Sequence, residues 1–214
     1  MTDPSLVYRT RRASGTPDGL LALLHGRGAD ERDLEPLLEA IDPNRRFVGV
    51  LPRGPLSLPP GGAHWYVVRQ IGYPDPTTFM TSFELLSGWL DATAEELGIP
   101  PERIVLGGFS QGAVMSYALG LAADRPPPAG ILAMSGFIPR VDGFDLDPHA
   151  RARLPVSISH GANDPVIGVQ WGRDARDRLS RAGLAVRYRE DPVGHTVSAG
   201  ALAQVRATLD KLLR

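Results

Sequence analysis

The chain has 214 residues, of which 43% are hydrophobic and 22% charged, proportions typical of a folded globular protein. Its 23 lysine and arginine residues nearly balance its 24 aspartate and glutamate residues, so no strong positive field favours nucleic acid or an anionic membrane as a partner. The sequence contains no cysteine, which excludes disulfides, thiolate metal ligands and a cysteine nucleophile. We expect one domain over residues 1–214.

The first 19 residues are polar and include Arg9, Arg11 and Arg12, without the apolar stretch that a signal peptide needs. No apolar run approaches the roughly 20 residues that span a bilayer. We therefore expect a cytoplasmic protein with no integral membrane segment.

Short apolar runs alternate along the chain with longer segments of helical period, a pattern typical of a mostly parallel sheet with helices on both faces. Strands are predicted at 20–24, 47–51, 103–107, 130–134, 156–159 and 185–189. The middle runs are apolar almost throughout, as strands buried on both faces require. The stretch 6–11 is a candidate for an edge hairpin with the first of these strands.

Apolar residues at steps of three and four predict a helix over 78–97 and two further helices toward the C-terminus. The stripes of the two later helices are Ile167, Trp171, Ala175, Leu179 and Ala182, and Leu202, Val205, Leu209 and Leu212. We interpret these stripes as core rather than as ligand sites. The segment after Ser110 is apolar nearly all round and predicts a buried helix. Two long stretches, 53–76 and 136–155, are rich in turn residues and are predicted to be irregular loops.

The motif GFSQG at 108–112 has the form G-x-S-x-G and stands directly between a predicted strand and a predicted buried helix. A serine at such a junction sits on a sharp turn where flanking side chains would collide, so glycine is needed on both sides. The turn lifts Ser110 clear of the sheet and places its hydroxyl at a helix N-terminus, where free N–H groups favour developing negative charge. We predict that Ser110 is a nucleophile; the alternative is a glycine-rich turn with an incidental serine.

A serine hydroxyl requires a base within hydrogen-bond reach, usually a histidine. His195 follows the last predicted strand and precedes the C-terminal helix, where a loop at the carboxyl edge of the sheet would present it, so we predict that it is the base. His25 and His160 follow other strands, and for both we favour a structural role in which the ring fixes a loop by hydrogen bonding. His64 and His149 lie in the long loops and are expected to be exposed.

The acid that orients the base is predicted to be Asp164. It lies four residues beyond the strand end at His160, which gives the chain order Ser, Asp, His of α/β hydrolases. The rival is Asp191, four residues before His195. A carboxylate so close in sequence more simply satisfies its own loop as an Asx turn before Pro192.

Acyl transfer also needs two N–H donors for a tetrahedral oxyanion. The amide of Gln111, directly after the serine, is one. The other is expected from the segment HGRG at 25–28, where the glycines allow the backbone to turn an amide inward, and we predict the amide of Arg27. Taken alone, this segment is also compatible with an ordinary strand-ending turn.

Together these residues resemble the carboxylesterase, lysophospholipase and acyl-protein thioesterase family of small α/β hydrolases. The resemblance rests on five segments that follow one another over nearly the whole chain: LLHGRGAD, GGAHWY, RIVLGGFSQGAVMSYAL with MSGFIP after it, HGANDPVI, and VGHTVS. It implies the α/β-hydrolase fold and a serine hydrolase that cleaves carboxylic esters or thioesters through an acyl-enzyme on Ser110. The family's acid and base fall on Asp164 and His195, and its oxyanion amides fall on Arg27 and Gln111.

The resemblance also sets expectations for the substrate, a small-molecule ester or thioester. Trp65, Phe137 and Ile138 are expected to contact it, with no metal and no cofactor, and a homodimer is left open. The chain departs from the best-known eukaryotic members, which usually carry Leu where Arg27 stands and lack its stretch 67–77. Backbone donation survives a change of side chain, so these departures bear on substrate choice. The Arg27 side chain either points into solvent, which is usual for a lone arginine, or favours an anionic substrate.

Two other functions remain as alternatives: an acyltransferase that uses the same acyl-enzyme, and a binding protein that has lost turnover on the same fold. Loss of turnover normally removes a member of the triad, and all three are present here. A nucleotide-binding function is disfavoured, since neither G-x-G-x-x-G nor G-x-x-x-x-G-K-[ST] occurs in the sequence.

Overall fold

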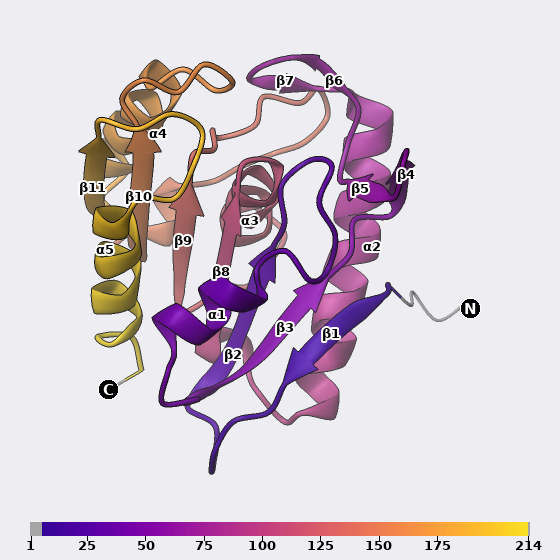
Figure 1. Ribbon diagram of the computed structural model, residues 1–214, viewed down its shortest axis with the longest axis vertical. Helices are drawn as coiled ribbons and strands as arrows, with labels where there is room; N and C mark the ends of the chain where they lie inside the picture. The colour runs from indigo at the N-terminus through magenta and orange to yellow at the C-terminus, as the bar shows by residue number, and fades with distance from the viewer. Residues whose placement is uncertain (1–5, 214) are drawn as a thin grey trace.

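A seven-stranded sheet with helices on both faces forms the centre of the computed structural model, which describes residues 6–213 (Figure 1). The strand order is β1-β3-β2-β8-β9-β10-β11, and every neighbouring pair is parallel except β1 with β3. The strands are β1 (Tyr8–Arg11), β2 (Gly19–Leu24), β3 (Phe47–Pro52), β8 (Ile104–Phe109), β9 (Gly130–Met134), β10 (Pro155–Gly161) and β11 (Ala185–Asp191). The predicted α/β fold is confirmed, and the six predicted strands match β2, β3 and β8 to β11 within two residues.

Within residues 6–213, two helices cover one face of the sheet and three cover the other, and two short 3-10 helices lie in connections. They are α1 (Glu35–Ile41) and α5 (Ala199–Leu209) on the first face, α2 (Pro76–Glu96), α3 (Gln111–Leu121) and α4 (Gln170–Arg181) on the second, and the 3-10 turns Pro101–Arg103 and His149–Arg151. The sequence of β2 is wholly apolar because helices cover both faces of this strand. Leu21 and Leu23 pack toward α1 and α5, whereas Leu20, Ala22 and Leu24 pack toward α2 and α3.

Helix boundaries differ from the predicted ones where a cap decides them. Helix α2 begins two residues before the predicted start because Asp75 caps it, accepting a hydrogen bond from the Thr78 amide at 2.9 Å, with Pro76 in the first turn. Helix α4 begins only at Gln170. Ile167, which we assigned to the stripe of this helix, therefore lies in the loop before it.

The predicted loop at 53–76 is instead folded into two small antiparallel hairpins. In these, β4 (Leu56–Leu58) pairs with β5 (Gly62–His64), and β6 (Val68–Gln70) pairs with β7 (Tyr73–Pro74). Strands of two or three residues are too short to show a hydrophobic period, so the turn residues between them dominated the pattern. The other predicted loop, 136–155, is irregular apart from the 3-10 turn and one isolated bridge.

The predicted pairing of 6–11 with 20–24 is wrong, although the strand within 6–11 does lie at the edge of the sheet. Strand β1 pairs antiparallel with β3, with Tyr8 opposite Pro52 and Arg11 opposite Gly49. Both edges of β2 are occupied, by β3 and by β8, so the free edge of β3 receives β1.

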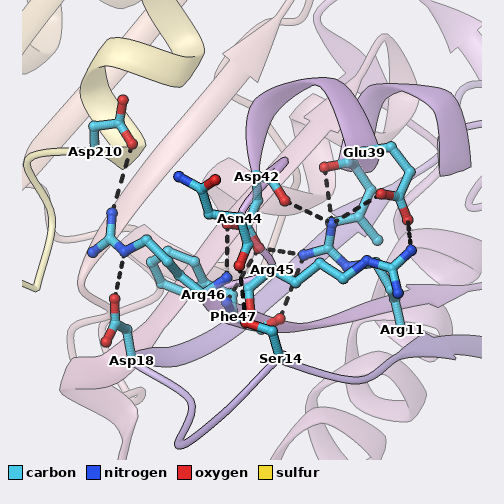
Figure 2. Close-up of polar contacts among 11 residues, drawn as sticks. Arg11, Ser14, Asp18, Glu39, Asp42, Asn44, Arg45, Arg46, Phe47 and Asp210 are labelled. Carbon is cyan, nitrogen blue, oxygen red and sulfur yellow. Dashed lines mark hydrogen bonds and ion pairs between the residues drawn. The ribbon is translucent and has the colours of Figure 1, made fainter.

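A buried network of polar side chains holds this edge in place at the start of β3 (Figure 2). The guanidinium of Arg11 pairs with the carboxylate of Asp42, the C-cap residue directly after α1, and both side chains are at least nine-tenths buried. Asp42 also accepts from the amides of Arg46 and Phe47, at 2.9 and 3.1 Å. Arg46 extends the network to Asp210 after α5, 3.6 Å away. These contacts join β1, α1, β3 and α5 at the end of the sheet opposite the carboxyl ends of the parallel strands.

Candidate active site

Ser110 stands on the turn between β8 and α3, at the carboxyl end of the central strands. Its backbone has φ 54° and ψ −119°, a conformation that residues with a Cβ rarely adopt. The flanking glycines are required by contact: a Cβ on Gly108 would lie 2.4 Å from the carbonyl carbon of Gly112, and one on Gly112 would lie 1.8 Å from the Leu24 oxygen. The serine is 7% exposed, so the turn presents it to a cavity rather than to open solvent.

His195 and Ser110 come together although they are 85 residues apart. His195 lies in the loop between β11 and α5, and its Nε2 is 3.0 Å from the Ser110 Oγ. Its Nδ1 is 2.6 Å from Oδ2 of Asp164. The ring of Phe109 lies against the imidazole, with centroids 4.8 Å apart. One hydrogen-bonded path therefore joins the hydroxyl, the imidazole and the carboxylate.

The side chain of Asp164 is fully buried in the loop after β10. Burial by itself raises the pKa of this carboxyl, but hydrogen bonds from His195 and from the amides of Ile167 and Val166 outweigh it and lower the pKa below its usual value. The two amides donate to Oδ1 at 2.9 and 2.8 Å. The carboxylate is thus ionised near neutral pH and accepts a hydrogen bond from the Nδ1–H of His195, which leaves the lone pair of Nε2 facing the serine.

The rival acid, Asp191, is occupied elsewhere. Its carboxylate accepts from Arg189 at 2.6 and 2.7 Å and from the hydroxyl of Ser198. The expected Asx turn does not form among the described contacts, because these two side chains satisfy the carboxylate instead. The conclusion that Asp191 serves its own loop still holds.

Among the described residues, the other four histidines make no hydrogen bond to Ser110. His25 accepts from the Gly54 amide at 2.9 Å, and His160 donates to the Ile167 carbonyl at 2.7 Å, so both rings fix loops as expected. His149 is exposed. His64 is 8% exposed rather than solvent-facing, because β5 packs against the core.

The two amides predicted as oxyanion donors come from two different segments that meet near Ser110. The Gln111 amide is at the N-terminus of α3, and the Arg27 amide lies in the loop after β2. Within residues 6–213 neither N–H has a hydrogen-bond acceptor. The loop passes close to Ser110, since a Cβ on Gly26 would lie 3.4 Å from the Ser110 Cβ. Both donors are therefore free to bind an oxygen atom next to Ser110.

The Gln111 side chain has a second task that the sequence pattern did not reveal. Its Oε1 accepts from the Trp65 amide at 3.0 Å, and its Nε2 donates to the Tyr66 carbonyl at 2.9 Å. Trp65 in turn donates from its indole to the His25 carbonyl at 2.9 Å. These bonds hold the start of α3, the 65–66 segment and the loop after β2 in one fixed arrangement.

A cavity of about 200 Å³ opens beside Ser110. Its walls are Arg27, Tyr66, Val68, Gln70, Ile71, Ser110, Gln111, Phe137, Val166 and Ile167. Apolar side chains dominate this wall, and Arg27, whose side chain is exposed, is its one charged member among the described residues.

Of the three residues expected to contact substrate, only Phe137 lines this cavity. Trp65 and Ile138 pack in the core, at 0% and 3% exposure. Tyr66, next to Trp65 in the same motif, takes its place in the wall, and burial raises the pKa of its hydroxyl. The sequence identified the motif but could not show which of the two adjacent aromatic rings lines the cavity and which packs in the core. Val68, Gln70 and Ile71 were missed because their short hairpin was predicted as a loop, and Ile167 because it fits the stripe of α4.

Two further results concern metals and membranes. Residues 6–213 contain no group of three or more histidine, aspartate or glutamate side chains placed to hold a metal ion. In the same part of the chain, no helix combines the length and the apolar character that crossing a bilayer demands.

Comparisons with known proteins identify the family of the chain. The family model described as phospholipase/carboxylesterase matches residues 9–213. An acyl-protein thioesterase 1 of Candida albicans is 31% identical over 166 residues, which are 72% of this chain and 71% of the relative. Among solved structures, the carboxylesterase of Bacillus cereus aligns with a TM-score of 0.84 at 25% identity, covering 96% of this chain and 94% of the other. The esterase PE8 aligns with a TM-score of 0.82 at 28% identity, covering 97% and 99%.

Proposed function

Because the chain belongs to the phospholipase/carboxylesterase family, we propose that it is a serine hydrolase that cleaves carboxylic esters or thioesters through an acyl-enzyme on Ser110. The observation that carries the assignment of roles is the hydrogen-bonded path Ser110–His195–Asp164, with links of 3.0 and 2.6 Å, at the edge of an apolar cavity. A hydroxyl, an imidazole and an ionised carboxylate in this order are the parts that activate a serine near neutral pH.

In the first half of the reaction the Ser110 oxygen attacks the substrate carbonyl while His195 takes the hydroxyl proton. The carbonyl oxygen becomes an oxyanion held by the amides of Gln111 and Arg27. Collapse of this intermediate breaks the bond to the alcohol or thiol, which leaves with the proton from His195, and the acyl group stays on Ser110. Asp164 keeps the ring oriented and stabilises its charged form.

In the second half a water molecule gives its proton to His195 and attacks the acyl-enzyme. The second tetrahedral intermediate is held by the same two amides, and its collapse returns the proton to Ser110 and releases the carboxylic acid. The chain's own residues provide every proton transfer in this scheme, so we expect EDTA to leave the rate unchanged.

The test combines turnover with labelling of the nucleophile. Ser110→Ala should lose roughly 10⁶ in kcat on a p-nitrophenyl ester, the scale of loss of a triad serine. A fluorophosphonate probe should label the wild type and fail to label this variant, whereas Ser180→Ala, an exposed serine on α4, should label as the wild type does. Labelling at another serine, or retained turnover in Ser110→Ala, would overturn the assignment. Assays with added alcohol or thiol separate hydrolysis from acyl transfer, because a transferase forms the new ester or thioester in preference to the acid.

A further inference from the structure

The β6–β7 hairpin forms the outer wall of the cavity beside Ser110 and lies above the carboxyl ends of the strands (Figure 1). Its residues Val68, Gln70 and Ile71 face the cavity. The base of the hairpin is tied to the start of α2. The Val67 amide donates to the Thr78 hydroxyl, and the Asp75 amide donates to the Val67 carbonyl, both at 3.1 Å.

The tip of the hairpin is held separately, by contacts that cross to the other side of the site. Gly72 has φ +90°, and a Cβ there would lie 2.1 Å from Cη2 of Trp171, so the indole rests directly on the Gly72 backbone. The Arg140 amide donates to the Gly72 carbonyl at 3.1 Å. The ring of Trp171 also contacts Phe137 of the cavity wall, with centroids 5.6 Å apart.

The Arg140 side chain completes this attachment. Its guanidinium lies over the ring of Tyr73 at 5.8 Å and over that of Trp171 at 5.4 Å. It donates to the Tyr73 hydroxyl at 3.1 Å and to Asp174 on α4 at 3.4 Å. We call Arg140, Tyr73, Trp171 and Asp174 the clasp. The clasp joins the hairpin tip to the loop after β9 and to α4.

The cavity behind the clasped hairpin is small. An engineered protein cavity of about 150 Å³ holds one benzene, a group of six carbons. On that scale the roughly 200 Å³ here would hold an acyl group of about eight carbons. A longer chain needs more room than the cavity provides behind the hairpin, whose tip is held by the backbone hydrogen bond from Arg140 to Gly72 and by the side chains of the clasp.

We propose that Arg140 is a positioning residue that limits the acyl length of the substrate, by clasping the β6–β7 hairpin over a cavity that admits about eight carbons. This inference rests on the proposed function and names the substrate class for the same site. A longer acyl chain fits only when the hairpin tip lifts, which separates Tyr73 from Arg140 and Gly72 from Trp171.

The test measures kcat/KM for p-nitrophenyl esters from acetate to laurate. In the wild type, kcat/KM should fall by about tenfold or more between octanoate and laurate, since misfit of even one methylene in a pocket changes it on that scale. Arg140→Ala should raise the laurate-to-butyrate ratio of kcat/KM about tenfold, chiefly through a lower KM for laurate. Backbone amides of residues 68–73 should exchange hydrogen faster in this variant. Arg140→Lys keeps the charge but loses the planar stacking. Its laurate-to-butyrate ratio should therefore lie between those of the wild type and Arg140→Ala.

The matched control is Arg173→Ala. Arg173 lies on the same helix as Trp171 and Asp174 and pairs with Glu190 at 2.7 Å, but it lines no part of the cavity. This variant loses an arginine–carboxylate pair and should keep the wild-type length profile. Tyr73→Ala, at a ring that is 43% exposed, removes the hairpin's half of the clasp with little effect on the core and should shift the profile as Arg140→Ala does.

The outcomes separate this inference from the function on which it rests. An enzyme that labels at Ser110 and cleaves butyrate, but whose length profile is the same in Arg140→Ala and Tyr73→Ala as in the wild type, would overturn the clasp. So would an equal loss of kcat/KM at every chain length. A wild type that neither labels nor cleaves any ester would instead overturn the proposed function. If Arg140→Ala does not fold, the Tyr73→Ala profile decides the matter.

Discussion

Nδ1 of His195 lies 2.6 Å from Oδ2 of Asp164, and this contact turns Nε2 of the same ring toward Ser110. Asp164→Asn would present an amide N–H or a weaker acceptor to Nδ1, so the ring would favour the tautomer with its proton on Nε2. That tautomer cannot accept the serine proton. We expect kcat to fall by about 10⁴, the scale of the same change in serine proteases, with the fold intact by circular dichroism.

Asp191→Asn is the matched comparison. Asp191 is paired with Arg189 and Ser198, so its loss should disturb the loop before α5 and lower kcat by no more than roughly tenfold. Steady-state kinetics on one ester at saturating concentration distinguishes the two variants. The reverse order of losses would assign the acid to Asp191.

The strained backbone of Ser110 should lower the free energy of unfolding by a measurable amount. A residue with a Cβ held at φ 54° and ψ −119° carries a conformational penalty on the order of 1 to 3 kcal/mol, which glycine does not have. Ser110→Gly should therefore raise the free energy of unfolding by about 1 kcal/mol, although it abolishes turnover. Ser110→Ala keeps the Cβ and should stay within roughly 0.5 kcal/mol of the wild type.

Urea unfolding of both variants measures this difference. Ser180→Gly, in the last turn of α4, is the reference for glycine at an unstrained helical position. There we expect the free energy of unfolding to fall by roughly 0.5 to 1 kcal/mol. A Ser110→Gly variant that is destabilised like Ser180→Gly would mean that the turn at Ser110 carries no strain.

The side chain of Gln111, in addition to its backbone amide, should contribute to stability and to turnover. Gln111→Ala leaves the Trp65 amide and the Tyr66 carbonyl without partners in a buried site, which costs about 1 to 3 kcal/mol for each group. We expect the midpoint of urea unfolding to fall accordingly, and kcat to fall because Tyr66 and the cavity wall lose their fixed position. Gln111→Glu retains the acceptor for Trp65 and should be less destabilised. Equal stability of Gln111→Ala and the wild type would contradict this role.

The sheet order could be predicted only in part, for a physical reason. Strands buried on both faces, such as β2 and β8, give apolar runs that are evident in the sequence. The edge strand β1 is exposed and polar, and its partner is decided by which sheet edge is free and by the buried contact between Arg11 and Asp42. Neither fact is local to the strand, so its pairing was assigned wrongly.

The site shows the same division between local and distant causes. Ser110 is identified by glycines at fixed offsets, because the turn itself collides with any other residue there. The cavity wall depends instead on which face of a segment meets the core. Trp65 turns inward because its indole reaches the His25 carbonyl, and Tyr66 faces the cavity in consequence. Ile167 leaves the helix stripe because its amide binds Asp164, a contact that periodicity does not contain.

His25 and His160 are buried histidines that take no part in the proposed reaction. Burial lowers the pKa of His25 and of His160 below the usual histidine value. The Nε2 of His25 accepts from the Gly54 amide, which is possible only for the neutral ring. The folded protein thus binds fewer protons at these positions than the unfolded chain does.

The sign of the pH effect follows from this difference. Above pH about 6.5 the histidines are neutral in both states, and they give the stability no pH dependence. As the pH falls from about 6.5 toward the lowered folded pKa, the unfolded chain takes up protons first, and each ring lowers the free energy of unfolding by up to about 1.4 kcal/mol per pH unit. Urea unfolding at half-unit steps from pH 8 to 5 should show this decline. His25→Gln should reduce its slope. A slope that His25→Gln does not alter would mean that the His25 ring becomes charged inside the folded protein.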